Sequence, residues 1–244
     1  MFDSLINQVA VITGAGRGIG RAIAQGYAQQ GASVVCAARS QVETEETVAE
    51  IKAFGGKAAA VVCDVTDMQS VENLFATAHT IYGGIDLVVL NAGIDGDHHP
   101  VVNSDPALWT HIIDVNLMGA YRCARTAIPY MQQRGGGQIL TLGSGLGHHG
   151  RPEQSAYACS KAGLWMFTRI LANELATENI SVNEIIPGPV NTSMASPQNE
   201  NSVFSIKTEW IKEPKDVVPL ALFLATHPKP GPTGQSFSLM RRTS

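Results

Sequence analysis

Short apolar runs recur along the chain at intervals that leave room for one helix between consecutive runs. Seven of them predict β-strands, at 8–13, 32–37, 58–62, 86–90, 138–142, 180–186 and 235–239. The segments between them have helix length, and two are long, at 105–134 and 154–178. Apolar strands that alternate with helices are typical of a parallel sheet covered on both faces. The pattern therefore predicts an α/β fold.

Composition and charge narrow the class of protein. Hydrophobic residues make up 44% of the chain and charged residues 16%, which fits a globular enzyme with a substantial core. No linker or repeat interrupts the 244 residues, so we expect a single domain over 1–244. The net charge of −4 gives no footprint for nucleic acid. Because the chain shows neither a signal-peptide pattern nor a membrane-length apolar run, we expect a cytoplasmic protein.

A glycine-rich turn, TGAGRGIG at 13–20, joins the first predicted strand to a segment with helical spacing. Gly14 permits a tight turn, Gly18 lets a pyrophosphate approach the backbone, and Gly20 lets the helix pack closely on the strand. The phosphates would then meet free N–H groups at the helix N-terminus. The GxxxGxG spacing predicts a dinucleotide site, and no Gly-Lys-Ser/Thr follows that would indicate a P-loop. The alternative is an ordinary strand-to-helix turn rich in glycine.

The end of the second predicted strand indicates which dinucleotide is bound. An acidic residue there would accept from the ribose 2′-hydroxyl of NAD, whereas an arginine accommodates the 2′-phosphate of NADP. The chain has Ala38 and Arg39 at this point, and Arg17 lies within the glycine-rich turn. Two guanidinium groups near the adenosine end favour NADP(H) over NAD(H). The alternative is that both arginines are solvated surface side chains.

Tyr157 and Lys161 are one helical turn apart, and Ser144 precedes Tyr157 by thirteen residues. A phenol near an ammonium group is suited to proton exchange with a carbonyl oxygen, because the cation favours phenolate. We therefore expect Lys161 to lower the pKa of Tyr157 from its ordinary value of about 10. Ser144 ends a predicted strand, where its hydroxyl can donate to a substrate carbonyl oxygen. A nucleophilic serine is the alternative, although Gly-x-Ser-x-Gly is absent.

The joint order of these motifs resembles the short-chain dehydrogenase/reductase family over nearly the whole chain. Further matches are Asp64-Val65, Asn91-Ala92-Gly93, Asn116, and Pro187-Gly188 followed by Thr192. The resemblance implies a doubly wound Rossmann fold with a seven-stranded parallel sheet in the order 3-2-1-4-5-6-7. It also implies a homo-oligomer, a tetramer or dimer, formed through the two long helical segments. The tail from Ser236 to Arg242 departs from the family's common Asp-Gly-Gly ending, which bears on the usual C-terminal subunit contact.

The resemblance implies a role for each matching residue. Asn116, Ser144, Tyr157 and Lys161 would be catalytic, with Asn116 holding a water that relays protons to the lysine and Lys161 binding the nicotinamide ribose. The cofactor-binding set would be Gly14, Arg17, Gly18, Ile19, Gly20, Arg39, Asp64, Val65, Asn91, Ala92, Gly93, Tyr157, Lys161, Pro187, Gly188, Val190 and Thr192.

Several of these residues have a structural alternative when they are considered by themselves. Asn116 could be a core asparagine with satisfied hydrogen bonds, and Gly93 could be a plain loop glycine. Asp64, which in the family accepts from the adenine amino group, could be a solvated neighbour of a helix N-cap at Thr66 or Asp67.

Together the motifs predict an NADP(H)-dependent oxidoreductase that transfers hydride between the nicotinamide and a carbonyl or secondary alcohol. Tyr157 would be the general acid or base. The substrate would be small to medium and polar, as for a carbonyl reductase or alcohol dehydrogenase. One alternative is a 3-oxoacyl-[acyl-carrier-protein] reductase, which is disfavoured because Arg134 is the only cation near 135–137 and 177–179. The other is a dinucleotide-sensing binding protein without turnover.

The expected substrate walls include a loop at about 188–212 and two histidine pairs. His98-His99 and His148-His149, the latter beside Arg151, are either surface histidines or a polar pocket for an anionic or hydroxyl-rich substrate. We expect no metal site, because zinc-ligand spacing is absent and the chemistry needs none. The four cysteines lack CxxC spacing and are expected to be reduced packing thiols. Cys159, about 200° around the helix from Tyr157, should face away from the chemistry.

Overall fold

A single parallel sheet organises the part of the chain that this computed structural model describes, residues 4–194, 209–228 and 231–241. Its seven strands follow the order β3-β2-β1-β4-β5-β6-β7, which confirms the predicted fold class and topology. The strands are β1 (Val9–Thr13), β2 (Ser33–Ala38), β3 (Lys57–Val62), β4 (Leu87–Leu90), β5 (Gly137–Leu142), β6 (Ile180–Ile186) and β7 (Ser236–Ser238).

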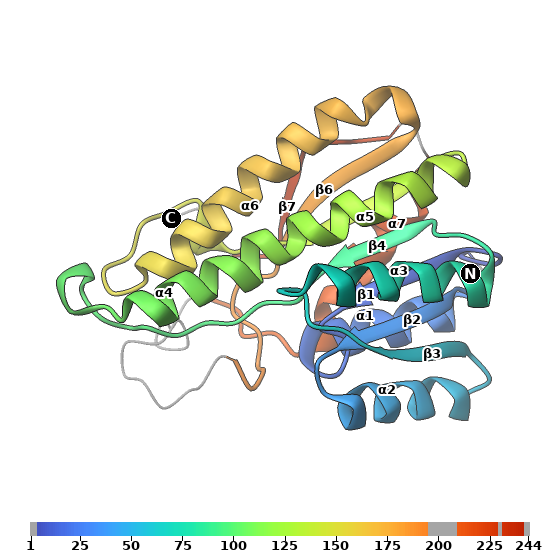
Figure 1. The fold of residues 1–244 in the computed structure, drawn as a ribbon, viewed down its shortest axis with the longest axis horizontal. Helices are drawn as coiled ribbons and strands as arrows, with labels where there is room; N and C mark the ends of the chain where they lie inside the picture. The colour runs from blue at the N-terminus through green and yellow to red at the C-terminus, as the bar shows by residue number, and fades with distance from the viewer. Residues whose placement is uncertain (1–3, 195–208, 229–230, 242–244) are drawn as a thin grey trace.

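Helices cover both faces of this sheet (Figure 1). Buried residues of α3, α5 and α6 pack on one face, and those of α1, α2 and α7 pack on the other. The helices are α1 (Gly18–Gln29), α2 (Gln41–Ala53), α3 (Met68–Tyr82), α4 (Pro106–Ile113), α5 (Gly119–Gln133), α6 (Ser155–Glu174) and α7 (Val218–Thr226). Short helical turns are η1 (Val101–Asn103), η2 (Asp114–Met118), η3 (Gly145–Gly147), η4 (Ala176–Glu178) and η6 (Pro214–Val217).

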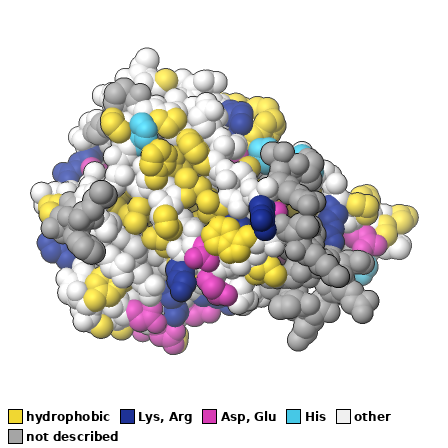
Figure 2. Space-filling model, turned by 180° about the vertical axis from the view of Figure 1, so that it is seen from behind, with side chains coloured by type: hydrophobic (Ala, Val, Ile, Leu, Met, Phe, Trp, Pro, Cys, Tyr) yellow, Lys and Arg dark blue, Asp and Glu magenta, His cyan; other side chains and the backbone are white. Residues whose placement is uncertain are grey.

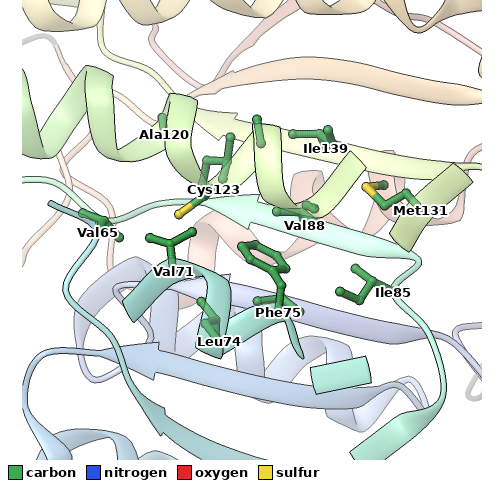
Figure 3. Packing of buried hydrophobic residues seen from close by; sticks show 14 of the residues in the cluster. Val65, Val71, Leu74, Phe75, Ile85, Val88, Ala120, Cys123, Met131 and Ile139 are labelled. Carbon is green, nitrogen blue, oxygen red and sulfur yellow. The ribbon is translucent and has the colours of Figure 1, made fainter. Parts of the chain in front are cut away.

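The core on the α3–α5 side shows why the apolar runs are strands buried on both faces. Phe75 of α3 is fully buried and lies among Val88 of β4, Cys123 of α5 and Ile139 of β5 (Figure 3). The opposite faces of β1 and β2 are filled by apolar residues of α1. Two-sided burial removes the need for alternating polar positions, so the strands carry nearly continuous apolar sequence.

The long segment predicted at 105–134 is helical but not uniform. It consists of α4, the π-helical turn η2 and α5 in direct succession. Asn116 lies within the π-helical turn and is buried. A π-helical turn inserts one extra residue into the helix and is frequent at functional sites. None of the described helices is long and apolar enough to cross a membrane.

Candidate active site

A cavity of about 200 Å³ opens at the carboxyl ends of β1, β2, β3 and β4. In an open α/β sheet a ligand binds at this edge, where the strand order reverses. The predicted cofactor residues that line it are Gly14, Arg17, Gly18, Ile19, Arg39, Asp64, Val65, Asn91, Ala92, Gly93 and Thr192. The other predicted cofactor residues do not line it: Gly20, Tyr157, Lys161, Pro187, Gly188 and Val190. Residues 195–208 of the expected substrate loop lie outside the described part of the structure.

Close packing around the glycine-rich turn leaves no room for side chains at Gly14 and Gly20. Gly14 has a φ of +65°, a conformation that side chains disfavour. A Cβ at Gly20 would lie 2.3 Å from the Gly14 carbonyl oxygen and 2.5 Å from Asn91 Nδ2. The turn therefore needs glycine for the geometry expected of a phosphate cradle at the start of α1.

Thr13 and Asn91 tie the ends of β1 and β4 together beneath this turn. Thr13 Oγ1 accepts from the backbone N–H groups of Asn91 and Ala92, both at 3.1 Å. Asn91 Nδ2 donates to the carbonyl oxygens of Thr13 at 2.9 Å and Gly14 at 3.1 Å. The Asn91 amide thus positions the turn, and Thr13 is a supporting residue that the sequence analysis gave no role.

The adenosine end of the cavity carries two exposed arginines among carboxylates. Arg17 Nη1 lies 3.3 Å from Glu43 Oε1, and Arg39 is close enough to Asp64 to influence its titration. Acidic and basic side chains also gather along the lower edge of the molecule, over α2 (Figure 2). Because Arg17 is 68% exposed, its ion pair is weak and can be exchanged for another anion.

Asp64 is part of a local turn. Its Oδ1 accepts from Thr66 N at 2.9 Å and Thr66 Oγ1 at 2.7 Å. Burial acts to raise the pKa of Asp64, but these bonds and the charge of Arg39 outweigh it and lower the pKa. Asp67 caps α3 by accepting from Gln69 N at 3.0 Å. The N-cap considered as the alternative is therefore present, and Asp64 still lines the cavity.

Ser144, Tyr157 and Lys161 meet where β5 ends against α6. Ser144 Oγ accepts from Leu146 N at 3.2 Å and lies close enough to the Tyr157 phenol to lower its pKa. Lys161 is buried, donates from Nζ to the Leu142 carbonyl oxygen at 2.7 Å, and lies 5.7 Å from the Tyr157 ring centroid. The structure therefore brings the three predicted catalytic side chains together.

The pKa of Tyr157 differs from expectation. Burial of the phenol raises its pKa to about 12, opposed by the nearby Ser144 hydroxyl and assisted by the charge of Asp95. Burial also lowers the pKa of Lys161 to about 8, against the raising effects of Glu184 and Asp95. The predicted lowering of the tyrosine pKa by Lys161 is thus wrong for this structure, because desolvation dominates and the ammonium group is directed at the Leu142 carbonyl.

Asn116 joins the catalytic group to the loop after β4. Its Oδ1 accepts from Ile94 N at 2.8 Å, and its Nδ2 donates to Ile94 O at 2.9 Å and Ser160 Oγ at 3.0 Å. The side-chain amide is therefore satisfied by protein groups. A Cβ at Gly93 would lie 3.3 Å from Asn116 Oδ1 and 3.7 Å from Lys161 Nζ, so the cavity wall directly adjoins both residues.

The histidines divide into two environments. His98 Nδ1 lies 2.5 Å from Gln154 Nε2, and its Nε2 lies 3.8 Å from Asp95 Oδ2. His148 instead points inward, with Nε2 at 3.2 Å from Oε2 of the fully buried Glu184. The surface alternative is therefore wrong for His148.

Asp95 and Glu184 are the charged residues near the catalytic group that the sequence analysis missed. Both act on the titration of Lys161, and Asp95 acts on Tyr157 as well. Glu184 had a usable signal, since it is the acidic residue of β6, a strand predicted from sequence. Asp95 follows the Asn-Ala-Gly motif in a loop, where an acidic residue is common and gives no such signal.

The tail after β7 returns to the same region. Leu239 N donates to the Ile186 carbonyl oxygen at 2.9 Å. A Cβ at Gly145 would lie 2.6 Å from Met240 Sδ, and one at Gly188 would lie 2.9 Å from Met240 Cγ. Met240 therefore packs on the loops that follow both Ser144 and β6.

The four cysteines are free thiols. Cys36, Cys63 and Cys123 are buried and Cys159 is exposed, and Cys63 lines the cavity. Among the described residues, no three His, Cys, Asp or Glu side chains gather where they could hold a metal ion.

Comparison with known proteins identifies the family. The family model for short chain dehydrogenases matches residues 8–203. The chain belongs to the short-chain dehydrogenase/reductase family. It is 38% identical over 232 residues to a short-chain type dehydrogenase/reductase of Picea abies, covering 90% of this chain and 86% of the relative. It is 36% identical over 239 residues to a 3-oxoacyl-[acyl-carrier-protein] reductase of Synechocystis, covering 97% and 96%.

Solved structures of this family share the fold. A short-chain dehydrogenase/reductase from Burkholderia xenovorans superposes with a TM-score of 0.91 at 32% identity, covering 98% of this chain and 96% of the other. Levodione reductase also gives 0.91, at 26% identity and 97% coverage of both chains. The chain is therefore an oxidoreductase of a family that uses a nicotinamide dinucleotide, and the cavity with its glycine-lined edge fits such a cofactor.

Proposed function

We propose that this short-chain dehydrogenase/reductase is an NADP(H)-dependent carbonyl reductase or alcohol dehydrogenase for a small to medium polar substrate. The observation that carries the proposal is the position of Gly93. It lines the dinucleotide cavity, and a Cβ there would lie 3.7 Å from Lys161 Nζ. The cofactor cavity and the catalytic side chains therefore share one wall, as hydride and proton transfer to a single carbonyl require.

When bound, the nicotinamide dinucleotide supplies or accepts the hydride. Tyr157 donates its proton to the carbonyl oxygen in reduction and takes one from the alcohol in oxidation. Ser144 lies beside the same phenol and can donate to the substrate oxygen, which holds that oxygen near the proton donor. The Lys161 ammonium favours the phenolate once it faces the tyrosine and the cofactor ribose, and Asn116 fixes the adjoining Ile94 backbone.

The preference for NADP(H) rests on the charges at the adenosine end. Arg17 and Arg39 both line the cavity and are exposed. The Arg17 pair with Glu43 can be replaced by a pair with a 2′-phosphate, which carries more charge than a carboxylate. Val190 and the Pro187-Gly188 turn, beside Thr192 at the cavity wall, would hold the carboxamide end.

The substrate side favours hydroxyl groups over anions. Asp95 lies close enough to Tyr157 and Lys161 to influence both, and His98 and Gln154 extend this polar wall. A carboxylate beside the reacting atoms repels an anionic substrate and accepts hydrogen bonds from hydroxyl groups. Of the two substrate types considered from the sequence, the hydroxyl-rich one is therefore the better fit.

A 3-oxoacyl-[acyl-carrier-protein] reductase is the second candidate. Its support is the identity to relatives of that name in Synechocystis and Thermotoga maritima, 36% and 35%. The acidic carrier would need free cations at the pocket mouth. Arg134, the cation considered for this role, lies instead at the amino ends of β1 and β4, away from the cavity, where it binds Asp86 Oδ1 at 3.0 Å and the Asn7 carbonyl oxygen at 2.9 Å.

The proposal includes a homo-oligomer. Met118, Tyr121, Met166 and Ile170 are exposed apolar side chains on or next to α5 and α6, the two long helices expected to pair between subunits. Analytical ultracentrifugation at micromolar concentration tests this, and a monomer throughout would contradict it.

The experiment that tests the function is a substrate panel. Polyhydroxylated ketones, simple ketones, aldehydes and acyl thioesters are offered with NADPH or NADH, and absorbance of the reduced nicotinamide is followed. We expect the fastest turnover with NADPH and a hydroxylated carbonyl compound. Turnover of acyl thioesters alone would favour the second candidate, and tight NADPH binding without any turnover would favour a dinucleotide-sensing protein.

A further inference from the structure

A charged side chain lies in the middle of the sheet behind the catalytic lysine. Glu184 is on β6 and is completely buried. It pairs in register with Thr141 of β5, whose hydroxyl meets Thr168 of α6 at 2.9 Å, so this face of the sheet is turned toward α6. A buried carboxylate without compensation costs several kcal/mol, and such a residue therefore needs a partner.

The hydrogen bonds around Glu184 satisfy only one of its oxygens. Oε2 accepts from Ser236 Oγ of β7 and lies 3.2 Å from His148 Nε2. Oε1 finds no hydrogen-bond partner among the described residues. A Cβ at Gly143 would lie 1.9 Å from this Oε1, so the oxygen is pressed against the backbone between Leu142 and Ser144.

The same stretch of backbone also receives the catalytic lysine. Lys161 Nζ donates to the carbonyl oxygen of Leu142, the residue before Gly143. The free oxygen of Glu184 and the ammonium group of Lys161 therefore lie at adjacent positions of one strand end. Of the charges that raise the pKa of Lys161 against the effect of burial, Glu184 is the largest.

Trp165 and Arg169 of α6 cover the group formed by Glu184, His148 and Ser236. Trp165 and Arg169 follow Lys161 at successive helical turns. Trp165 contacts the His148 ring at 5.3 Å between centroids, and Arg169 stacks 4.4 Å over the Trp165 ring and donates to Ser236 at 3.3 Å. His148 and Trp165 thus stand between Glu184 and solvent, which preserves the low dielectric that makes its charge effective.

We infer that Glu184 is a positioning residue, the buried counter-charge that favours the charged form of Lys161 and holds its ammonium group at the end of β5. This role depends on the proposed function only because that function makes Lys161 a catalytic residue. The other titratable groups that face Lys161 are Tyr157 on its own helix and Asp95 on the loop after β4, with His148 and Arg169 behind Glu184. Asp95 is 26% exposed, so solvent screens it more than it screens Glu184.

The test is the titration of Lys161 itself, followed by NMR in protein with ¹³C-labelled lysine and assigned with Lys161→Met. We expect Glu184→Gln, which keeps the shape and the bond to Ser236, to lower the Lys161 midpoint by about one to three pH units. The matched control is Glu174→Gln, the same change at an exposed position on α6. An unchanged Lys161 midpoint in Glu184→Gln would overturn the inference.

A second variant keeps the test decisive if Glu184→Gln does not fold. Coupling between two titrations is reciprocal, so Lys161→Met must raise the midpoint of Glu184 by as much as Glu184→Gln lowers that of Lys161. In ¹³C-glutamate-labelled protein we expect this rise, and a Glu184 midpoint that ignores the loss of Lys161 contradicts the inference. Both titrations are read without substrate, so a shifted midpoint in a protein that reduces no carbonyl compound rejects the proposed function and leaves this inference standing.

Discussion

The dinucleotide side of the site is positioned mainly by backbone groups, and the catalytic side mainly by ionisable side chains. On the dinucleotide side, at the ends of β1 and β4, backbone amides and carbonyls do the positioning, held by Thr13 and Asn91. On the catalytic side, between β5, β6 and α6, ionisable side chains do this work: the half-buried Tyr157 and the buried Lys161 and Glu184. A mutation on the first side changes shape, whereas one on the second side changes charge.

Substitutions on the two sides should therefore destabilise the protein in different ways, by steric clash on one side and by an altered charge on the other. The turn at Gly14 and Gly20 tolerates no additional atom, because an added Cβ would lie below ordinary contact distance from its neighbours. The catalytic side holds a lysine whose charged form is destabilised by burial. We expect steric substitutions to act mainly on cofactor binding and isosteric charge substitutions to act mainly on turnover and on the pH dependence of stability.

The largest expected effect is that of Tyr157→Phe. The change removes one hydroxyl and keeps the ring, so turnover should fall by about 10² to 10⁴, the usual contribution of a positioned acid or base. NADPH affinity, measured by fluorescence titration, should stay within a few-fold of the parent. Near-normal turnover on a confirmed substrate would mean that proton transfer does not pass through Tyr157.

The next effect concerns Lys161, whose removal should raise the free energy of unfolding although it lowers activity. The pKa of Lys161 is about 8 in the native state against an ordinary 10.5, so between these values the unfolded chain binds more protons and stability rises with pH. Below pH 8 the whole penalty is present, about 3 kcal/mol.

Lys161→Met removes that penalty. Relative to this variant, the parent should therefore gain stability between pH 8 and pH 10 in urea unfolding, while the variant loses NADPH affinity and turnover. A stability difference that stays constant across this pH window would show that Lys161 titrates normally.

Gly20→Ala tests the dinucleotide side. Its Cβ would meet the Gly14 carbonyl oxygen at 2.3 Å, and overpacking of this kind costs about 1–3 kcal/mol. We expect a lower unfolding midpoint together with weaker NADPH binding. Gly150→Ala is the matched control, because a Cβ there meets nothing within 4 Å. Equal behaviour of the two variants would show that the turn is more plastic than its packing implies.

The smallest effect concerns the choice of cofactor. Arg39→Asp should weaken NADPH and strengthen NADH, each by roughly tenfold, the effect of about 1.4 kcal/mol. Lys52→Asp, an exposed reversal of charge at the end of α2, controls for net charge. Calorimetric titration of both cofactors decides, and equal affinities for NADPH and NADH in the parent protein would remove the basis for the preference.

The fold and the dinucleotide side were readable from sequence for a physical reason. Strands buried on both faces need nearly continuous apolar sequence, and the positive φ at Gly14 favours glycine. Both features can therefore be recognised from the residue types alone. That Tyr157 and Lys161 lie close together could also be predicted, because one helical turn fixes their spacing.

Their electrostatics could not be predicted in the same way. Whether Lys161 lowers the pKa of Tyr157 depends on which carbonyl receives its ammonium group and how deeply the phenol is buried, and neither is local in sequence. The pair of Glu184 and His148 joins residues 36 positions apart. The π-helical turn at Asn116 could not be predicted from the sequence either, since a single extra residue in a helix barely alters the hydrophobic period.

The packing of Met240 has a practical consequence. Its side chain rests on Gly145 and Gly188, and the next residue, Arg241, donates its backbone N–H to Glu209 at 2.9 Å. Shortening the Met240 side chain would therefore loosen the loop after Ser144 and the loop after β6 at once, so kinetic work needs this residue intact.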